Sequence, residues 1–239
     1  MTTWRSLQQS IVRCDRCERL ISHCRRVARE KRAAHRNERY WGKPVPDFGS
    51  PRARLLIVGL APGAHGANRT GRMFTGDRSG DFLNRALHET GFANQLTSER
   101  RGDGLVLQDA CITAAVHCAP PGNKPAREEF EACGAHLTAT FDAMRALHGV
   151  VALGGIAFRA ALLQFRARGW LAEGPAPRFG HGAFSRAPGH PFLLASYHPS
   201  QQNTFTGRLT PEMLRAVFSR ARSEIEAGAG RPARQERSQ

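Results

Sequence analysis

Lysine is almost absent from this chain: Lys31, Lys43 and Lys124 are the only three, and every other basic residue is an arginine. An enzyme that cleaves through a Schiff base needs an amine nucleophile, so such chemistry has few candidates here. The chain also lacks an apolar run of about 18 residues that could span a bilayer. Residues 1–14 contain no apolar core of the kind that signal peptides carry. We therefore expect a cytoplasmic protein, whose six cysteines are metal ligands or buried thiols rather than disulfides.

Two phosphate-binding motifs are missing as well. The sequence contains neither Gly-x-x-x-x-Gly-Lys-Ser/Thr nor Gly-x-Gly-x-x-Gly. A nucleoside triphosphate or NAD is therefore not the expected ligand. Internal repeats are absent too, so the fold is not a solenoid.

Positive charge is what the chain has in excess. It holds 35 basic and 20 acidic residues, a formal net charge of +15. Such a balance favours a polyanionic partner, most simply nucleic acid, although genomic bias towards arginine can supply part of it. A membrane surface is less well supported, because no basic helix has a bulky apolar face. Residues 18–39 are rich in arginine, and we interpret them as a basic helix that is either a solvated face or a phosphate-contacting flank.

Four short apolar runs predict strands: residues 55–60, 109–118, 150–153 and 192–197. Segments with helical periodicity lie between and around them, at residues 4–13, 79–89, 127–148, 157–165 and 211–227. Strands that alternate with helices predict an α/β fold with three layers, α/β/α, around a central, mostly parallel sheet of four strands. We expect one domain over residues 1–227, with two domains as the alternative, and a disordered tail over residues 228–239.

A long glycine-rich loop follows the first apolar run. Residues 61–77 exceed the usual two to six residues of such a connection, so the loop is either structural or, as we expect, a ligand-binding element. Loops at the carboxyl ends of parallel strands are where open α/β sheets bind ligands. The loops over residues 61–77, 119–124 and 198–206 should converge there. Polar side chains that this pattern places near a ligand are His65, Asn68, Arg69, Arg72 and Asp77.

The cysteines suggest a metal site. Cys14 and Cys17 form a chelating pair, and Cys118 and Cys133 lie where a strand ends and the next helix begins. These four thiolates could hold zinc or a [4Fe–4S] cluster, and the spacing alone does not separate the two. It differs from that of a zinc ribbon, which favours iron–sulfur. Scattered buried thiols are the alternative, and two further cysteines fit it because they lie within predicted elements: Cys24 and Cys111.

Three features together resemble one enzyme family. They are the four cysteines, the segment GLAPGAHGANRTGRMFTGD at residues 59–77 and the segment HPSQQN at residues 198–203. This combination resembles the iron–sulfur uracil-DNA glycosylases, families 4 and 5. Leu60 and Ala114 stand where family 4 usually carries an acid or amide and an asparagine, and these departures fit family 5. The chain also lacks the Lys-Arg-Arg-Ile-His insertion of a related family that crosslinks to uracil-DNA.

The resemblance implies a monofunctional DNA-repair glycosylase that removes uracil and other deaminated bases, such as hypoxanthine, and leaves an abasic site. It implies a [4Fe–4S] cluster on Cys14, Cys17, Cys118 and Cys133, and single- or double-stranded DNA as the partner of a monomer. Two other classes remain open: an iron–sulfur nuclease, which would need a carboxylate cluster for Mg²⁺, and a nucleic-acid-binding module with a structural metal.

Three residues are candidates for catalysis of base removal. The transition state of N-glycosidic cleavage resembles an oxocarbenium ion, and Asp77 could stabilise the cation and orient water, or merely cap the helix that follows. His198 could donate to the departing base, or be structural. Asn123 could read a pyrimidine edge or hold the water, or form a simple turn.

The remaining candidates bind substrate. Phe74 matches the aromatic residue on which the family stacks the flipped base, with ordinary core packing as the alternative. Residues 201–208 carry polar and aromatic side chains suited to the gap that the base leaves. The substrate-binding set that we predict is Gly59, Ala61, Gly63, Phe74 and Arg208.

Overall fold

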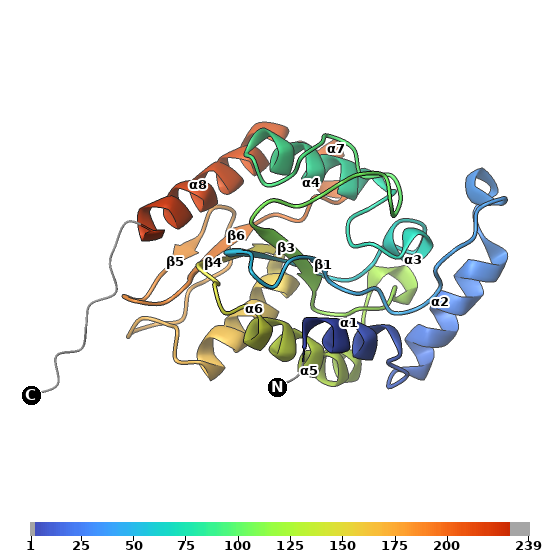
Figure 1. Ribbon diagram of the computed structural model, residues 1–239, viewed down its shortest axis with the longest axis horizontal. Coiled ribbons are helices and arrows are strands. Elements are labelled where there is room, and N and C mark those ends of the chain that lie inside the picture. The colour runs from blue at the N-terminus through green and yellow to red at the C-terminus, as the bar shows by residue number, and fades with distance from the viewer. Residues whose placement is uncertain (1–2, 230–239) are drawn as a thin grey trace, which may run out of the picture.

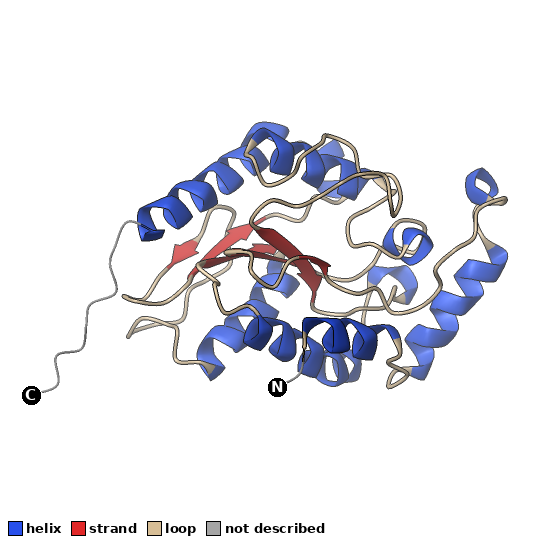
Figure 2. Cartoon of the chain, viewed as in Figure 1, coloured by secondary structure: helices blue, strands red, loops and turns tan. Residues whose placement is uncertain are grey.

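Four strands form the centre of the computed structural model, which describes residues 3–229 (Figures 1 and 2). Every residue of these strands is buried. Successive side chains of a strand point to opposite faces of the sheet, so apolar runs of this kind require cover on both faces. The four are β2 (Leu55–Gly59), β3 (Ala110–Ala114), β4 (Gly149–Leu153) and β6 (Phe192–Ser196).

The sheet has six strands in the order β1-β3-β2-β4-β6-β5. The four buried strands pair in parallel, as predicted. Two edge strands were not predicted: β1 (Phe48–Gly49) and β5 (Phe184–Ser185), which pair antiparallel with β3 and β6. Two residues are too few to show a periodic pattern, so only tertiary pairing reveals them.

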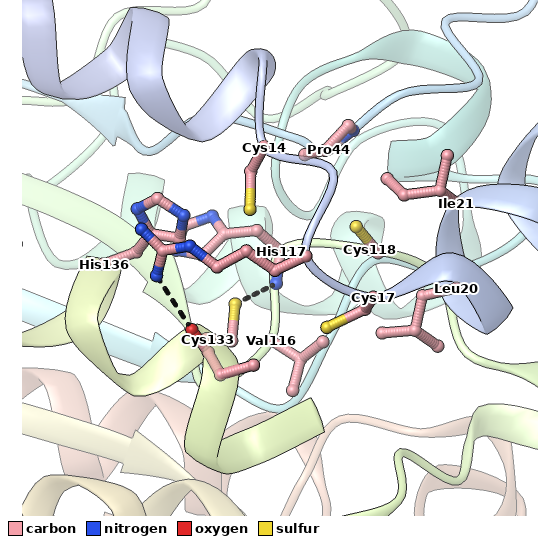
Figure 3. Close-up of a pocket in the computed structure, with 12 residues that line it drawn as sticks. Cys14, Cys17, Leu20, Ile21, Pro44, Val116, His117, Cys118, Cys133 and His136 are labelled. Carbon is pink, nitrogen blue, oxygen red and sulfur yellow. Dashed lines mark hydrogen bonds between the residues drawn. The ribbon is translucent and has the colours of Figure 1, made fainter. Parts of the chain in front are cut away.

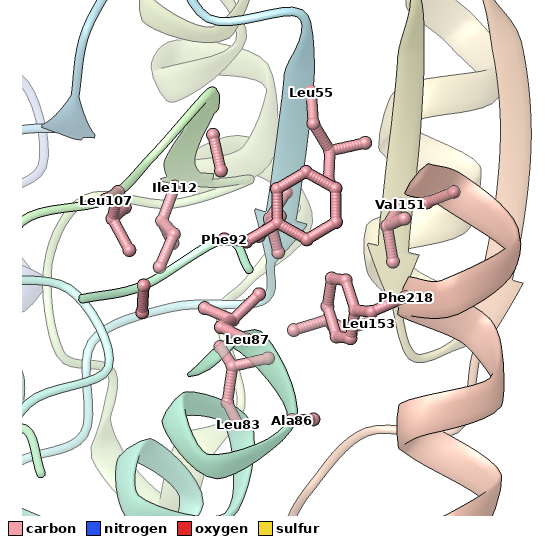
Figure 4. Packing of buried hydrophobic residues seen from close by; sticks show 14 of the residues in the cluster. Leu55, Leu83, Ala86, Leu87, Phe92, Leu107, Ile112, Val151, Leu153 and Phe218 are labelled. Atoms are coloured by element: carbon pink, nitrogen blue, oxygen red, sulfur yellow. The ribbon is translucent and has the colours of Figure 1, made fainter. Parts of the chain in front are cut away.

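Helices cover both faces of the sheet (Figure 1). On one face lie α4 (Arg78–Glu89) and α8 (Pro211–Ala229), and on the other α1 (Trp4–Val12), α5 (Arg127–Ala143) and α6 (Gly155–Ala167). Figure 4 shows Phe218 of α8 and Leu87 of α4 packed over Leu55, Ile112 and Val151 of the strands. The residues next in sequence to these three point to the opposite layer, so the three-layer α/β/α prediction is confirmed.

The shorter elements depart from the sequence predictions at their ends. The basic segment forms α2 (Glu18–Glu30) and ends there, because Lys31 has a φ of 55°, which is incompatible with a continuing α-helix. The long glycine-rich loop contains a short helix, α3 (Ala67–Thr70). Helix α8 runs two residues past its predicted end, and the rest of the predicted tail, residues 230–239, lies outside the described residues. The other short elements are η1 (Ala33–His35), η2 (Pro121–Asn123) and α7 (Gln201–Phe205).

The chain changes direction across the sheet at the carboxyl ends of β2 and β4. The chain leaves β2 through α4 to reach β3 on one side, and α5, on the opposite face, then carries it to β4 on the other side of β2. A reversal of this kind is the switch point at which open α/β sheets bind ligands. The loops expected to converge, after β2, β3 and β6, leave the parallel strands at this edge, and the loop after β4 joins them there. Among residues 3–229, the helices are all too short or too polar to span a bilayer.

A buried ion pair braces the loop after β2 from the side. The guanidinium of Arg72 donates to both carboxylate oxygens of Asp103 at 2.7 Å, and the two side chains are only 8% and 10% exposed. Asp103 also accepts from the backbone amides of Glu99, Arg100 and Leu105. Burial acts to raise the pKa of Asp103, but these donors outweigh it and hold that pKa well below its usual range.

We expect Asp103→Asn to lower the free energy of unfolding by about 3 kcal/mol, because it leaves a buried guanidinium without its counter-charge. Asp103 has a lowered pKa in the folded state, so its contribution is complete above the unfolded pKa of about 3.9 and is lost as the pH falls below it. Urea denaturation at neutral pH and near pH 3 would measure both effects. The control is Glu131→Gln, which removes an exposed ion pair with Arg127 and should cost less than about 0.5 kcal/mol.

Candidate functional site

A strained turn brings an aromatic ring to the functional edge. Phe74 takes a φ of 48°, unusual for a residue with a side chain, and its ring lies directly over Gly59 at the end of β2. A Cβ atom on Gly59 would lie 2.7 Å from the Phe74 ring, so only glycine allows this packing. On its other side, the Phe74 ring lies 6.1 Å from the ring of His198, centroid to centroid. The predicted residues Gly59, Phe74 and His198 therefore meet.

Asp77 follows that turn and performs the capping role that the sequence left open. Its Oδ1 accepts a hydrogen bond of 2.9 Å from the amide of Gly80 and caps α4. Its Oδ2 lies against Gly63 and Gly66, where added Cβ atoms would stand 2.7 and 1.8 Å away. The loop thus needs glycine at both positions to admit the carboxylate.

Burial raises the pKa of Asp77 above its ordinary value. The backbone amides of Gly80 and Ser79 and the charge of Arg69 lower this pKa, but burial outweighs them. A desolvated carboxylate in a ligand-binding loop is typical of functional sites. The capping role therefore does not exclude a chemical one, since the two oxygens have different surroundings.

His198 follows β6 and packs against the loop after β4. Gly154, with a φ of 94°, lies so near that its Cβ would stand 3.1 Å from the Cβ of His198. The carbonyl of His198 accepts a hydrogen bond of 2.8 Å from the amide side chain of Asn203 in α7. This bond joins the first and last residues of the HPSQQN segment. Burial lowers the pKa of His198 to about 4. The imidazole is therefore neutral at neutral pH, and it can donate only through one N–H.

Two arginines of the glycine-rich loop are not where the sequence predicted them. Arg69 and Arg72 were expected to face a ligand, but both are buried and donate to protein acceptors. Asn68 is also buried, and its amide donates to carbonyls of Cys24 and Ala64. The prediction was wrong because the acceptors of the arginines come partly from other loops, Glu38 and Asp103, which sequence spacing does not reveal.

The other predicted substrate residues lie nearer the surface. Arg208 is exposed, and its guanidinium stacks on the ring of Tyr197 at 4.7 Å, beside His198. Asn123 is exposed in a turn with a φ of 57°. In the described part of the chain its side chain makes no hydrogen bond to Asp77 or His198. The structure thus gathers the predicted groups Gly59, Gly63, Phe74, Asp77 and His198 at one edge, with Arg208 beside His198.

The four predicted cysteine ligands line one hollow beside α2 and α5 (Figure 3). Cys14 and Cys17 come from the segment between α1 and α2. Cys118 lies four residues past the end of β3 rather than within a strand, and Cys133 lies in α5. The amide of His117 donates to the sulfur of Cys133 at 3.4 Å. Apolar side chains complete the wall: Leu20, Ile21, Pro44 and Val116.

The thiols of Cys118 and Cys133 are protonated as they stand. Burial raises the pKa of Cys133 to about 12. A contact with the thiol of Cys24 and burial both raise the pKa of Cys118, so a bound metal must displace these protons. Among residues 3–229, no three His, Cys, Asp or Glu side chains form a group that could hold a single metal ion.

The carboxylates near the edge do not resemble a nuclease centre. Asp103 is occupied by Arg72 and three backbone amides. Asp81 lies one turn along α4 from Asp77, and burial together with the charge of Asp77 raises its pKa. The Asp103 carboxylate is therefore already neutralised within the protein and is not free to bind Mg²⁺.

Comparison with known proteins adds an independent line of evidence. A profile of the uracil DNA glycosylase superfamily matches residues 46–222. A protein of Mycobacterium tuberculosis named type-5 uracil-DNA glycosylase is 52% identical over 213 residues, which cover 87% of this chain and 77% of that protein. A protein of Thermus thermophilus, also named type-5 uracil-DNA glycosylase, is 48% identical over 214 residues, which cover 90% of this chain and 94% of that protein.

A type-4 uracil-DNA glycosylase of Pyrobaculum aerophilum is more distant. It is 35% identical over 125 residues, 52% of this chain and 56% of that protein. The resemblance drawn from the glycine-rich loop and the HPSQQN segment is confirmed: the chain belongs to the uracil DNA glycosylase superfamily, and within it to the type-5 branch.

Proposed function

We propose that this protein is a DNA-repair glycosylase that hydrolyses the N-glycosidic bond of deoxyuridine in DNA and leaves an abasic site. The observation that carries the proposal is the meeting of a desolvated carboxylate, an aromatic ring and a neutral imidazole at the switch point of the sheet. Family membership supports the same reaction. Hypoxanthine and other deaminated bases are proposed as further substrates, on the resemblance to family 5.

Asp77 is the group proposed to act on the sugar. Cleavage builds positive charge on the deoxyribose ring, and an ionised carboxylate stabilises that charge more strongly in a site from which water is excluded. Because Oδ1 is held by Gly80, the carboxylate cannot rotate freely. Its Oδ2, against Gly63 and Gly66, is the oxygen that we assign to the sugar and the attacking water.

His198 is the group proposed to act on the base. Uracil leaves as an anion, which a fixed hydrogen-bond donor stabilises without a full proton transfer. A pKa of about 4 keeps the imidazole neutral, which suits donation rather than general-acid catalysis. Phe74, whose ring lies 6.1 Å from that of His198, supplies the stacking platform for the flipped base.

Binding to DNA rests on the arginine excess. Exposed arginines of α2, and Arg208 beside His198, are proposed to contact phosphates, which position the duplex but do not read its sequence. The enzyme is proposed to be a cytoplasmic monomer that works on double- or single-stranded DNA. Because Lys124 is the one lysine near the edge, and it is exposed on a turn, we propose that the enzyme leaves the strand uncut. Asn123, on that turn, is kept as a candidate reader of the base.

The four cysteines are proposed to hold a [4Fe–4S] cluster. Each thiolate of such a cluster binds a different iron, and the four predicted cysteines line one hollow. When bound, the cluster would supply a crosslink between the N-terminal segment and the sheet. Cys14 and Cys17 would anchor it from one side, Cys118 and Cys133 from the other, and the His117 amide would donate to a ligand sulfur.

The proposed reaction predicts that the purified chain releases uracil from a duplex with a single U·G pair. The strand should break only after alkali treatment, because hydrolysis leaves the sugar in place. Gel analysis with and without alkali, beside the same duplex with thymine, measures this. Cutting without alkali on both duplexes would indicate a nuclease, and binding without release a recognition module. Either result would remove the proposal.

Asp77→Asn should slow the single-turnover release of uracil by about 10²-fold or more, within the range of a positioned acid or base. Asparagine caps helices as well as aspartate does, so the melting temperature should change little, which separates chemistry from capping. Gly66→Ala should give a similar loss, because its Cβ would displace Oδ2. A rate near wild type for Asp77→Asn would leave the residue a cap alone.

Anaerobically purified protein should contain about four irons per chain and show a broad visible absorbance. Cys118→Ala should lose most of the iron, since one corner of the cluster loses its ligand. The matched control is Cys111→Ala in the buried strand β3, which should keep it. Elemental analysis and the absorbance spectrum measure both. Zinc in place of iron in the wild type would contradict the cluster assignment.

A further inference from the structure

Arg69 joins three segments of the functional edge through one guanidinium. Its Nε donates to the carbonyl of His65 at 2.8 Å, its Nη2 to the carbonyl of Gly76 at 2.8 Å, and its Nη1 to the carboxylate of Glu38. The side chain is only 8% exposed. A buried cation with such a set of acceptors is held in one position, and it holds its acceptors in turn.

Two of those acceptors flank the carboxylate of Asp77. Gly76 directly precedes Asp77, and His65 directly precedes Gly66, against which Oδ2 lies. The fork of Arg69 therefore fixes both walls of the space that holds the carboxylate. Gly76 has a φ of 78°, and a Cβ on it would lie 2.4 Å from Nη2 of Arg69, so the turn is shaped around the guanidinium.

Glu38 fixes Arg69 from outside the loop. Its carboxylate accepts from Arg69 and also from His35, at 2.6 Å from the latter's Nδ1. Glu38 belongs to the connector after α2, the arginine-rich helix. Through Arg69 it therefore joins this connector to the turn before Asp77. The backbone of Arg69 takes part as well, because the amide of Trp41 in the same connector donates to its carbonyl at 2.9 Å.

We propose that Arg69 is a positioning residue for the reaction, which holds Asp77 in place through Gly76 and His65 and keeps its carboxylate ionised. The inference rests on the proposed function, because it assigns Arg69 a part in that chemistry. It differs from a purely structural brace in one respect: the cation faces the carboxylate and lowers the pKa of Asp77, which burial raises. The charge of Asp77 in turn raises the pKa of Asp81 on α4, which Glu99 also raises and Arg78 lowers.

Two substitutions separate the geometric part from the electrostatic part. Arg69→Lys keeps the charge but cannot reach three acceptors, since an ammonium lacks the planar fork. Arg69→Gln keeps some hydrogen bonding but removes the charge. The matched control is Arg222→Lys, at a guanidinium that donates to the carbonyls of Thr90 and Gly91 at the far end of α4 and does not contact the site.

Single-turnover uracil release and the Kd for uracil-containing duplex should respond differently. Arg69→Lys should slow release by about 10²-fold, as a misplaced catalytic group does, with Kd within about threefold because phosphate contacts dominate binding. In Arg69→Gln the acid limb of the rate profile should move to higher pH, since the carboxylate must be ionised and its pKa rises. Arg222→Lys should lower the melting temperature without changing either rate or profile.

A second measurement does not depend on activity. The ¹³C chemical shift of the Asp77 carboxyl, followed by NMR titration without DNA, should show a higher pKa in Arg69→Gln than in the wild type. If the wild type releases no uracil, the proposed function fails, and this titration still tests whether Arg69 lowers the pKa of Asp77. If the wild type is active while Arg69→Lys matches its rate, or the Asp77 titration is unchanged in Arg69→Gln, the inference is overturned.

Discussion

The burial of one carboxylate, that of Asp77, is the constraint on which the functional edge depends. A desolvated charge is costly unless it is hydrogen-bonded, and here the loop meets that need with the amide of Gly80 and the nearby charge of Arg69. The same constraint explains why residues 63 and 66 are glycines, since a Cβ at either position would collide with Oδ2 of Asp77. The unusual backbone of the loop follows from fitting an anion, a ring and a guanidinium into one turn.

The sheet supplies the rigid frame that this turn needs. Its four parallel strands are buried on both faces, so polar functional groups can stand only beyond their ends. The strand order then decides which ends matter, because the connections after β2 and β4 diverge at this switch point. There Phe74 closes over Gly59, and His198 packs against Gly154.

Most of the fold could be predicted because its long elements carry unbroken apolar or helical patterns. The edge strands β1 and β5 could not, since their pairing partners, not their own residues, define them. At the site, motifs found Asp77, His198 and Phe74 correctly as neighbours of one edge. They misplaced Arg69 and Arg72, because a sequence shows an arginine but not the distant carboxylate that will bury it.

Asp77 illustrates how one residue can serve folding and chemistry without conflict. As an N-cap it lies at the positive end of the α4 dipole, where backbone amides favour its anionic form. Burial opposes that preference and makes the carboxylate more basic than a surface aspartate. A carboxylate so buried is weakly solvated, so little water must be reorganised when positive charge develops near its anionic form. The cap also fixes the direction of the second oxygen, and a scaffold that aims its charge before the substrate arrives is what electrostatic catalysis requires.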